Sequence, residues 1–234
     1  MFVSLLTYTP EAERVVATAA RLCYADVDCH ALAERSNPDD DRRMIEKVLA
    51  IGHHGVLEHA VFSFVTEGVS RALTHQLVRH RLASFAQQSQ RYVAFDGGFD
   101  YETPKSIAAQ PELAARYAEE MKRIAALYAD LREAGIAAED ARFILPNASH
   151  SRLIMTMNAR ELRHFFRLRC CNRAQWEIRD LATVMLIEAS KVAPVLFKDA
   201  GPGCLAGACP EGEMSCGKAL EVRRKFSVLL HSPT

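Results

Sequence analysis

Arginine, glutamine and serine are concentrated between residues 79 and 91, where the chain reads RHRLASFAQQSQR and carries no acidic side chain. The guanidinium group of arginine is a rigid fork of N–H donors that matches phosphate oxygens. Serine hydroxyls and glutamine amides can bind sugar hydroxyls and base edges. The segment therefore predicts a site for a phosphorylated small molecule that carries a ring. The sequence has neither a GxGxxG motif nor a Walker lysine, so we expect side chains, not a glycine-rich loop, to hold the phosphates.

Two more stretches share this bias, although the chain as a whole is neutral. Lysine plus arginine and aspartate plus glutamate both number 29. Acidic residues are absent from residues 68–95, 142–160 and 163–173, and each stretch holds several arginines. Solvated helix faces would produce the same pattern, because surface arginines are common. The alternative is that the three basic stretches bind several phosphates.

A cluster of histidines raises the question of a metal. The segment HHGVLEH, residues 53–59, contains His53, Glu58 and His59, which zinc would accept as ligands. The spacing differs from HExxH, and Glu58 and His59 directly precede an expected strand. We therefore expect a structural or cofactor-contacting role and no metal, with a zinc hydrolase as the alternative.

The cysteines offer two further alternatives. Cys204, Cys209 and Cys216 are separated by four and six residues, not by the paired CxxC spacing typical of zinc sites, so we expect ordinary thiols there. Cys170 and Cys171 lie beside arginines that could lower a thiol pKa. No general base is paired with either of them in the sequence, so a buried pair on a helix is the competing interpretation.

The elements that must position these residues follow no regular order. The pattern favours an α/β or mixed α+β fold without the alternation of a doubly wound sheet. On the helix expected at 70–82, Gln76 and Arg79 share one face. The long amphipathic helix expected at 110–134 is a candidate for subunit packing. Helices are expected at 10–22, 38–51, 70–82, 110–134, 138–144, 159–169 and 174–197, strands at 59–67 and 151–157, and loops at 84–91 and 200–217.

Composition limits the classes of protein that the chain could belong to. Its 234 residues, 49% apolar and 25% charged, are ordinary for one globular domain. Zero net charge argues against bulk attraction to nucleic acid or membranes, and no apolar run approaches the roughly 20 residues of a membrane span. No basic segment precedes the first apolar stretch, and the seven cysteines are an odd number. We therefore expect reduced thiols and a cytoplasmic location.

Several segments, in order, resemble the family of flavin-dependent thymidylate synthases. The RHR at 79–81, followed by seven residues, a serine, QR and a tyrosine, closely resembles the signature of that family. HHGVLEHAVFSF, ARFILPNA, MNARELRHFFRLR and AQWEIR resemble segments around it, and CPEGEMSCGK resembles a tail found in some members. The resemblance extends from about residue 52 to the tail and is specific because order and spacing agree together.

The resemblance implies a reaction and a fold. The family makes dTMP from dUMP, with 5,10-methylenetetrahydrofolate as carbon donor and NADPH as reductant through FAD. It implies one domain over residues 1–234, with a central sheet and long helices in a fold peculiar to the family. It also implies a homotetramer whose sites lie between subunits, which would explain three basic stretches in a neutral chain.

The resemblance also assigns residues to the nucleotide. Arg169 would be the catalytic residue, because a guanidinium group beside uracil N3 and O2 stabilises the anionic ring and makes C5 a better nucleophile. Ser89 lacks an adjacent base, so we expect it to form hydrogen bonds and not to act as a nucleophile. The residues expected at dUMP are Gln76, Leu77, Val78, Arg79, Gln87, Gln88, Ser89, Gln90, Arg91, Arg142 and Arg169.

A second set of residues is expected at the cofactor. This chain departs from the family at several positions: Ala86 replaces a common asparagine, Gln87 a glutamate of some members, and Gly55 a hydroxyl residue, and His164 and Arg173 stand where the family varies. These departures affect single contacts and not the reaction class. The residues expected at FAD are Gly55, Arg79, His80, Arg81, Gln87, Asn158, Ala159, Arg160 and His164.

A nucleic-acid-binding protein is the alternative from another functional class, since the same arginines could contact a phosphate backbone. Neutral net charge, a single tryptophan and basic stretches without interleaved exposed aromatic residues argue against it. We therefore expect dUMP, and neither nucleic acid nor a membrane, as the partner.

Overall fold

The structure is a computed structural model that describes residues 1–34 and 37–231. The chain divides into two compact units. The first consists of Met1–Phe2, Thr66–Arg79 and Phe85–Ile154, and the second of Val3–Val65, His80–Ser84 and Met155–Thr234. Each unit is therefore built from segments that are far apart in the sequence.

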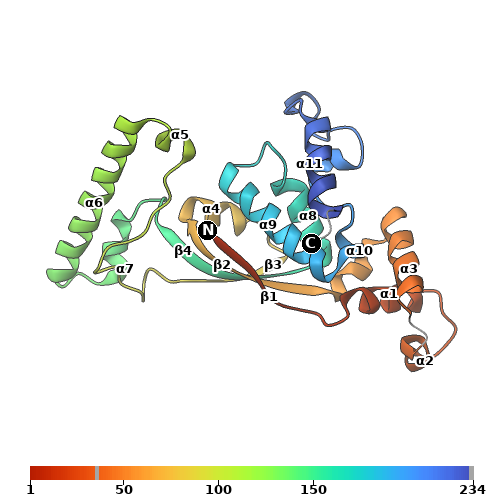
Figure 1. The fold of residues 1–234 in the computed structure, drawn as a ribbon. Coiled ribbons are helices and arrows are strands. Elements are labelled where there is room, and N and C mark those ends of the chain that lie inside the picture. Colours follow the sequence, from red (N-terminus) through yellow and green to blue (C-terminus); the bar gives the residue numbers. More distant parts are fainter. Residues whose placement is uncertain (35–36, 232–234) are drawn as a thin grey trace. The chain divides into compact units, whose positions relative to one another are not determined.

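One four-stranded sheet runs through the fold (Figure 1). Its strands are β1 (Phe2–Tyr8), β2 (Val61–Ser70), β3 (Ala83–Gln87) and β4 (His150–Asn158), in the order β1-β2-β4-β3. Neighbouring strands are antiparallel. Buried and less buried residues alternate along β4, as expected for a strand whose two faces differ. The expected mixed α/β fold with a central sheet is confirmed.

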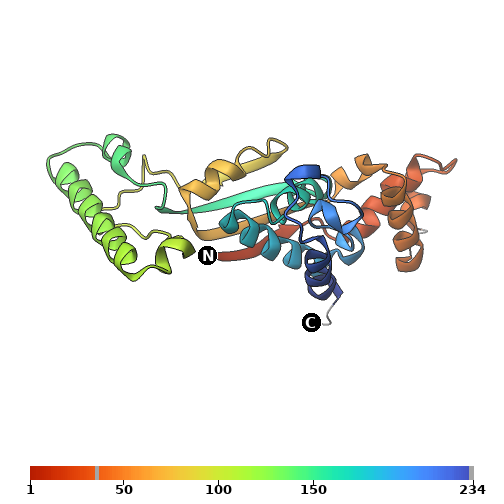
Figure 2. The same ribbon diagram turned by 90° about the horizontal axis from the view of Figure 1, so that it is seen from above.

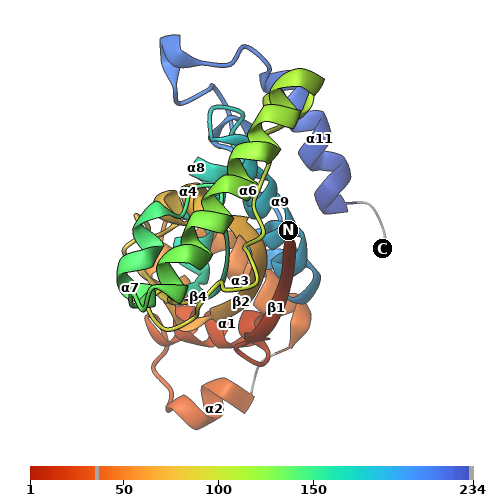
Figure 3. The same cartoon turned by 90° about the vertical axis from the view of Figure 1, so that its left-hand side faces the viewer.

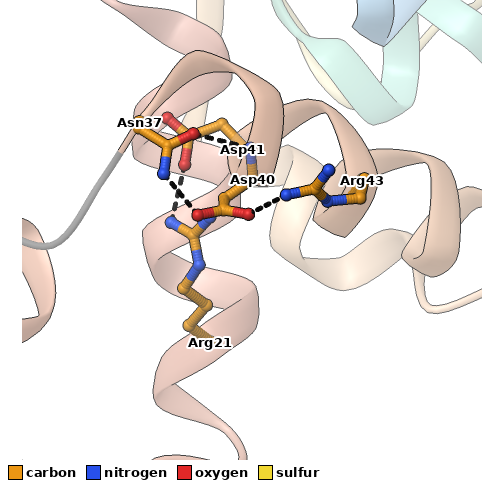
Figure 4. A network of polar contacts seen from close by, with 5 residues as sticks. All are labelled: Arg21, Asn37, Asp40, Asp41 and Arg43. Carbon is orange, nitrogen blue, oxygen red and sulfur yellow. Dashed lines mark hydrogen bonds and ion pairs between the residues drawn. The ribbon is translucent and has the colours of Figure 1, made fainter.

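In the second unit, two helices are joined by a largely buried ion pair (Figure 4). The helices are α1 (Ala12–Leu22) and α3 (Pro38–Ala50), and α2 (Cys29–Glu34) lies between them in sequence. Arg21 Nη1 on α1 lies 2.6 Å from Asp41 Oδ1 on α3, with side chains only 16% and 8% exposed. Asn37 begins α3 as its N-cap, because its Oδ1 accepts the Asp40 amide at 3.0 Å.

The second unit buries its core under three further helices. These are α8 (Ala159–Arg169), α9 (Trp176–Val192) and α10 (Pro194–Phe197), and the 3-10 helix η1 (His54–His59) packs against α8. Phe197 packs edge-on against Phe62 of β2 and Phe166 of α8, with ring centroids 5.3 and 5.9 Å apart. The chain then passes through η3 (Gly203–Leu205) and η4 (Gly212–Met214) into α11 (Ala219–His231), which contacts η3 and α9 (Figure 3).

The first unit contains the longest helix. Its helical elements are α4 (Arg71–Leu77), α5 (Lys105–Ala108), α6 (Pro111–Glu133), α7 (Ala138–Ala141) and η2 (Arg142–Ile144). Helix α6 is uninterrupted (Figure 2) and is followed by Gly135 at φ +84°, a conformation that favours glycine. It buries Met121 and Tyr128 and leaves Leu113 and Leu127 nearly half exposed.

The structure corrects several sequence-based expectations. Residues 83–87, placed mostly in the expected loop, form β3 because their main chain pairs with β4. The helix expected at 70–82 therefore ends at Leu77. Residues 2–8 form β1, and the helix expected to continue to 197 breaks before Pro194, which has no amide hydrogen to donate. Among the described residues, no helix is both long enough and apolar enough to span a membrane.

Candidate active site

The end of α4 presents the first group of expected nucleotide contacts. Ser70 begins the helix as its N-cap, since its Oγ accepts the Leu73 amide at 3.0 Å. Leu77 is fully buried, so any contact with a ligand would involve its main chain. Arg79 follows in an exposed turn and has no acidic partner within the part of the chain that the structure describes. Its guanidinium group is therefore available to an anion.

The expected contact Gln87 is anchored within the first unit. Its Nε2 donates to Thr74 Oγ1 at 3.1 Å and to Ser151 Oγ at 2.9 Å. Both amide hydrogens are engaged, so the side-chain oxygen remains as the acceptor that could face a ligand. The glutamine amide differs in this respect from the glutamate of some family members, whose carboxylate could only accept hydrogen bonds.

The residues after Gln87 form a turn. The Gln88 main-chain amide donates to the Arg152 oxygen at 2.8 Å and extends the pairing with β4. Ser89 Oγ accepts the Arg91 amide at 3.1 Å. This contact shapes the turn that precedes the Arg91 side chain. Gln90, also expected at dUMP, is partly exposed in the same turn.

Glu139 on α7 connects two expected dUMP contacts. Its carboxylate forms an ion pair with Arg91, and its main-chain oxygen accepts from Arg142 Nε at 3.0 Å. Burial and the positive charge of Arg142 lower the pKa of Arg71. Arginines that are distant in sequence therefore gather in the first unit, where an anion would relieve their mutual repulsion.

In the second unit, α8, its N-cap residue and η1 carry five of the nine expected FAD contacts. Gly55 is exposed, and a Cβ added there would meet no atom within 4 Å, so packing does not explain the glycine. Arg160 Nη1 lies 2.6 Å from Glu58 Oε1, with both side chains about half exposed. Arg81 is exposed and has no acidic partner among the described residues. This donor set suits the phosphates of a dinucleotide.

Three more expected FAD contacts lie at the start of α8 and on its surface. Asn158 is the N-cap of α8, with its Oδ1 accepting the Glu161 amide at 2.9 Å. Ala159 is fully buried, and its amide donates to the Ala60 oxygen at 2.8 Å. His164 is exposed on the same helix. Asn158 and Ala159 therefore stabilise the start of α8, whether or not they also contact a cofactor.

His80 and Arg169 are in direct contact in the second unit. Arg169 Nε donates to His80 Nε2 at 3.0 Å, and His80 Nδ1 lies 3.2 Å from Glu161 Oε1. His80 is 5% exposed, and its pKa is lowered chiefly by burial. The arginine expected to act on the pyrimidine is thus held by the histidine of the RHR segment.

The described cysteines include one deeply buried thiol and four thiols that share a cavity. Burial raises the pKa of the Cys170 thiol to about 12, which opposes formation of a thiolate. Four other thiols line a cavity of about 340 Å³ together with His164, Arg167 and Arg173. No three histidine, cysteine or acidic side chains within residues 1–34 and 37–231 are arranged to hold a metal. The four thiols that line the cavity are Cys171, Cys204, Cys209 and Cys216.

Residues 53–59, the histidine segment, make contacts with other parts of the chain. Glu58 is paired with Arg160, and His53 Nδ1 lies 3.3 Å from the hydroxyl group of Tyr24. These contacts give Glu58 and His53 partners within the chain, and the structural or cofactor-contacting role of the segment stays a prediction.

Three glutamates bind expected site residues. The sequence did not point to Glu139 or Glu161, and it pointed to Glu58 only as part of the histidine segment. Glu139 binds Arg91, Glu161 binds His80, and Glu58 binds Arg160. The Asn158-x-x-Glu161 spacing signals a capping box and so marks the start of a helix. That signal does not identify a partner 81 residues away in the chain.

Comparisons with known proteins agree over nearly the whole chain. Residues 4–195 match a family model described as thymidylate synthase complementing protein. A flavin-dependent thymidylate synthase of Geobacter sulfurreducens is 54% identical over 227 residues, covering 97% of this chain and 98% of that protein. The flavin-dependent thymidylate synthase of Clostridium tetani is 47% identical, covering 96% of each chain.

A solved structure supports the fold. The crystal structure of a UMP/dUMP methylase, PolB from Streptomyces cacaoi bound with 5-Br dUMP, has a TM-score of 0.72 against this chain. The two are 24% identical, and the match covers 84% of this chain and 93% of the other. At that identity the similarity concerns the fold alone.

Proposed function

Because this chain belongs to the family of flavin-dependent thymidylate synthases, we propose that it methylates dUMP to dTMP. The carbon donor would be 5,10-methylenetetrahydrofolate, and FAD reduced by NADPH would supply the hydride. The observation that carries this proposal is the 54% identity to a flavin-dependent thymidylate synthase across 97% of the chain. The residues matched by the family model, 4–195, include the RHR segment and the later arginines.

The arrangement of arginines in the first unit supports binding of the phosphate of dUMP there. Arg91 and Arg142 are gathered around Glu139, and the charge of Arg142 already disfavours the charged form of Arg71. A phosphate would compensate these positive charges and would compete with Glu139 for Arg91. The related methylase PolB was crystallised with 5-Br dUMP, which is consistent with a deoxyuridylate ligand.

Arg169 is the proposed catalytic residue. A guanidinium group beside uracil N3 and O2 stabilises negative charge on the ring, so that C5 can attack the methylene group. The bond between Arg169 Nε and His80 Nε2 holds this side chain in a defined orientation. A held donor stabilises developing charge without having to reorganise during the reaction.

The residues expected at FAD fit an anionic dinucleotide. Arg79 and Arg81 are exposed and lack acidic partners in the described part of the chain, and Arg160 has only a half-exposed ion pair to give up. The space beside Gly55 is open. These residues would bind the phosphates, and the flavin would supply hydride transfer when bound.

We further propose that residues 1–234 act as a single functional domain in a cytoplasmic homotetramer with shared sites. Phe143, Tyr92 and Leu82 are 82%, 78% and 74% exposed, and each lies within one residue of an expected site arginine. Large apolar side chains that are this exposed are typical of interaction surfaces, and a second subunit could bury them. Neither nucleic acid nor a membrane is required as a partner.

The test is an anaerobic assay with purified protein. We expect a yellow protein whose NADPH-reduced flavin is reoxidised only when dUMP and methylenetetrahydrofolate are both present, with dTMP detected by chromatography. A colourless protein that retains DNA in a salt-dependent manner would overturn the proposal. Metal analysis after chelation provides the corresponding check on a zinc enzyme.

A further inference from the structure

The second unit holds Glu161, His80 and Arg169 in a continuous series of contacts. We propose that Glu161 and His80 are positioning residues: Glu161 selects the tautomer of His80, and His80 fixes the guanidinium group of Arg169. This inference deepens the proposed function and rests on it, because it concerns how the proposed catalytic arginine is oriented.

The hydrogen-bond chemistry of the three groups allows only one tautomer. Arginine Nε carries a hydrogen and cannot accept, so His80 Nε2, 3.0 Å away, must be the unprotonated acceptor. The single proton of the neutral ring then lies on Nδ1, which donates to Glu161 Oε1 at 3.2 Å. A carboxylate can only accept, so it favours that tautomer over the other.

The position of Glu161 is set by α8 itself. The residue lies in the first turn of the helix, where its amide donates to the N-cap Asn158 and its negative charge is favoured by the helix dipole. Its side chain is 6% exposed and that of His80 is 4% exposed. A buried carboxylate is costly without partners, so its contact with His80 indicates a specific role.

Three charged or titratable groups of α8 act on His80. They are Glu161, His164 and Arg169, and the ring of Phe165 packs edge-on at 4.9 Å. Burial is the largest cause that lowers the pKa of His80; Arg169 and His164 also lower it, and Glu161 opposes them. The neutral ring required as an acceptor is therefore the favoured form at neutral pH.

Protonation of His80 would replace its hydrogen bond with Arg169 by repulsion. Nε2 would gain a hydrogen and face the Nε–H group of Arg169, with two positive charges in contact. Folding lowers the pKa of His80. The neutral ring therefore contributes its full stability above the ordinary histidine pKa. This stability is lost as pH falls through the pKa of His80 in the folded state. Turnover should fall in the same acidic window.

The first experiment measures the tautomer in the wild-type protein by ¹⁵N NMR of histidine-labelled holoenzyme, with His80→Asn used to assign the signal. At about pH 8 we expect a neutral ring protonated on Nδ1, with Nε2 bare. A ring protonated on Nε2, or an imidazolium, would overturn the inference. This result does not depend on activity, so it separates failure of the inference from failure of the proposed function.

The second experiment uses Glu161→Gln, which keeps the size of the side chain and removes its charge. We expect kcat to fall about 10-fold to 100-fold, the range found when a partner that orients a histidine ligand is removed. FAD binding and the KM for dUMP should change much less than kcat. The acidic limb of the kcat–pH profile should move to lower pH, because the carboxylate that favours protonated His80 is gone.

The matched control is Glu13→Gln. Glu13 is another glutamate in the first turn of a helix, α1, and its Oε1 accepts the main-chain amides of Val195 and Leu196 at 2.6 and 3.4 Å. Glu13→Gln should reproduce any general effect of losing a carboxylate in the first turn of a helix without moving the acidic limb. The inference would be wrong if the acidic limb of the kcat–pH profile were unchanged in Glu161→Gln, or if it moved equally in both variants. Absence of dTMP formation in the wild type would instead refute the proposed function.

Discussion

At the scale of single residues, the site is defined by what each arginine contacts. Arg169 donates to a buried histidine, whereas Arg91 forms an exposed ion pair with Glu139. A guanidinium group with a fixed orientation can stabilise charge that develops during a reaction. A guanidinium group in an exposed ion pair can exchange its partner for a ligand. The two arginines are therefore expected to affect different steps.

Replacing Arg169 by alanine should abolish most turnover and leave the protein folded and yellow. Loss of one preorganised donor to a developing anion costs about 100-fold to 1,000-fold in kcat. The measurement is dTMP formation beside the flavin absorbance of the purified variant. Arg167→Ala on the same helix is the control. A near-wild-type rate for Arg169→Ala would show that the arginine does not activate the pyrimidine.

Arg91→Ala should weaken dUMP binding about 10-fold, since a hydrogen bond to a charged group contributes about 1.5 kcal/mol or more. FAD binding should change little. Titration of each ligand, monitored by flavin absorbance or calorimetry, measures both effects. Arg123→Ala, which removes an exposed, ion-paired arginine on α6, serves as the control. Equal losses for both ligands would contradict the assignment of Arg91 to dUMP.

At the scale of elements, caps and ion pairs decide where helices begin and how they are joined. Asn37, Ser70 and Asn158 each accept a main-chain amide at a helix start. Asn158 is also an expected FAD contact, so one residue has two candidate roles. The α1–α3 contact depends on charge as well, because Arg21 and Asp41 meet where little solvent reaches them.

The two roles of Asn158 can be separated by substitution. Asn158→Ala should lower the free energy of unfolding by about 1 kcal/mol through loss of the N-cap, whereas Asn158→Ser should retain the cap. Thermal unfolding measures the cap, and flavin content measures the cofactor contact. If both variants bind FAD as the wild type does, Asn158 has only the structural role.

Removal of Asp41 should be costly because Arg21 would remain buried without this carboxylate. We expect Asp41→Ala to lower the free energy of unfolding by about 3 kcal/mol, as is usual when one partner of a buried ion pair is lost. The double variant Arg21→Met/Asp41→Leu should recover most of that loss. Urea unfolding compares the three proteins. A double variant as unstable as Asp41→Ala would show that the ion pair itself is needed.

At the scale of the whole molecule, expected site residues belong to two units of the chain. Arg91 and Arg142 lie in the first unit, and His80, Arg160 and Arg169 in the second. A neutral chain can still create positive sites, because its acids are placed elsewhere or paired with particular arginines. In a symmetric oligomer, a site can also draw residues from different copies.

Mixing two impaired variants, assayed at a dUMP concentration well below the KM, tests whether sites are shared between subunits. If Arg91 and Arg169 reach one site from different subunits, random mixing of Arg91→Ala and Arg169→Ala chains should restore about a quarter of the sites. If both come from the same subunit, no intact site can form. The assay is dTMP formation after co-expression, with each variant alone as the baseline. No recovery in confirmed mixed oligomers would refute sharing of these two residues.

Local sequence patterns predicted much of the fold. The expected helices at 38–51, 110–134 and 159–169 agree with α3, α6 and α8, because caps, helical spacing and a terminal glycine act over a few residues. The failures involve β1 and β3. Short strands depend on partners elsewhere in the chain, so Phe2–Tyr8 and Ala83–Gln87 gave no local signal that could be separated from a loop.

The order of residue types along this chain was enough to establish its family and to name the arginines from which a phosphate site could be built, because such motifs are local and chemically specific. The pairing of those arginines required the folded chain. Glu139 meets Arg91 across 48 residues, and Glu161 meets His80 across 81. Contacts over such separations depend on how helices and strands pack, and this packing makes His80 a neutral acceptor that holds Arg169.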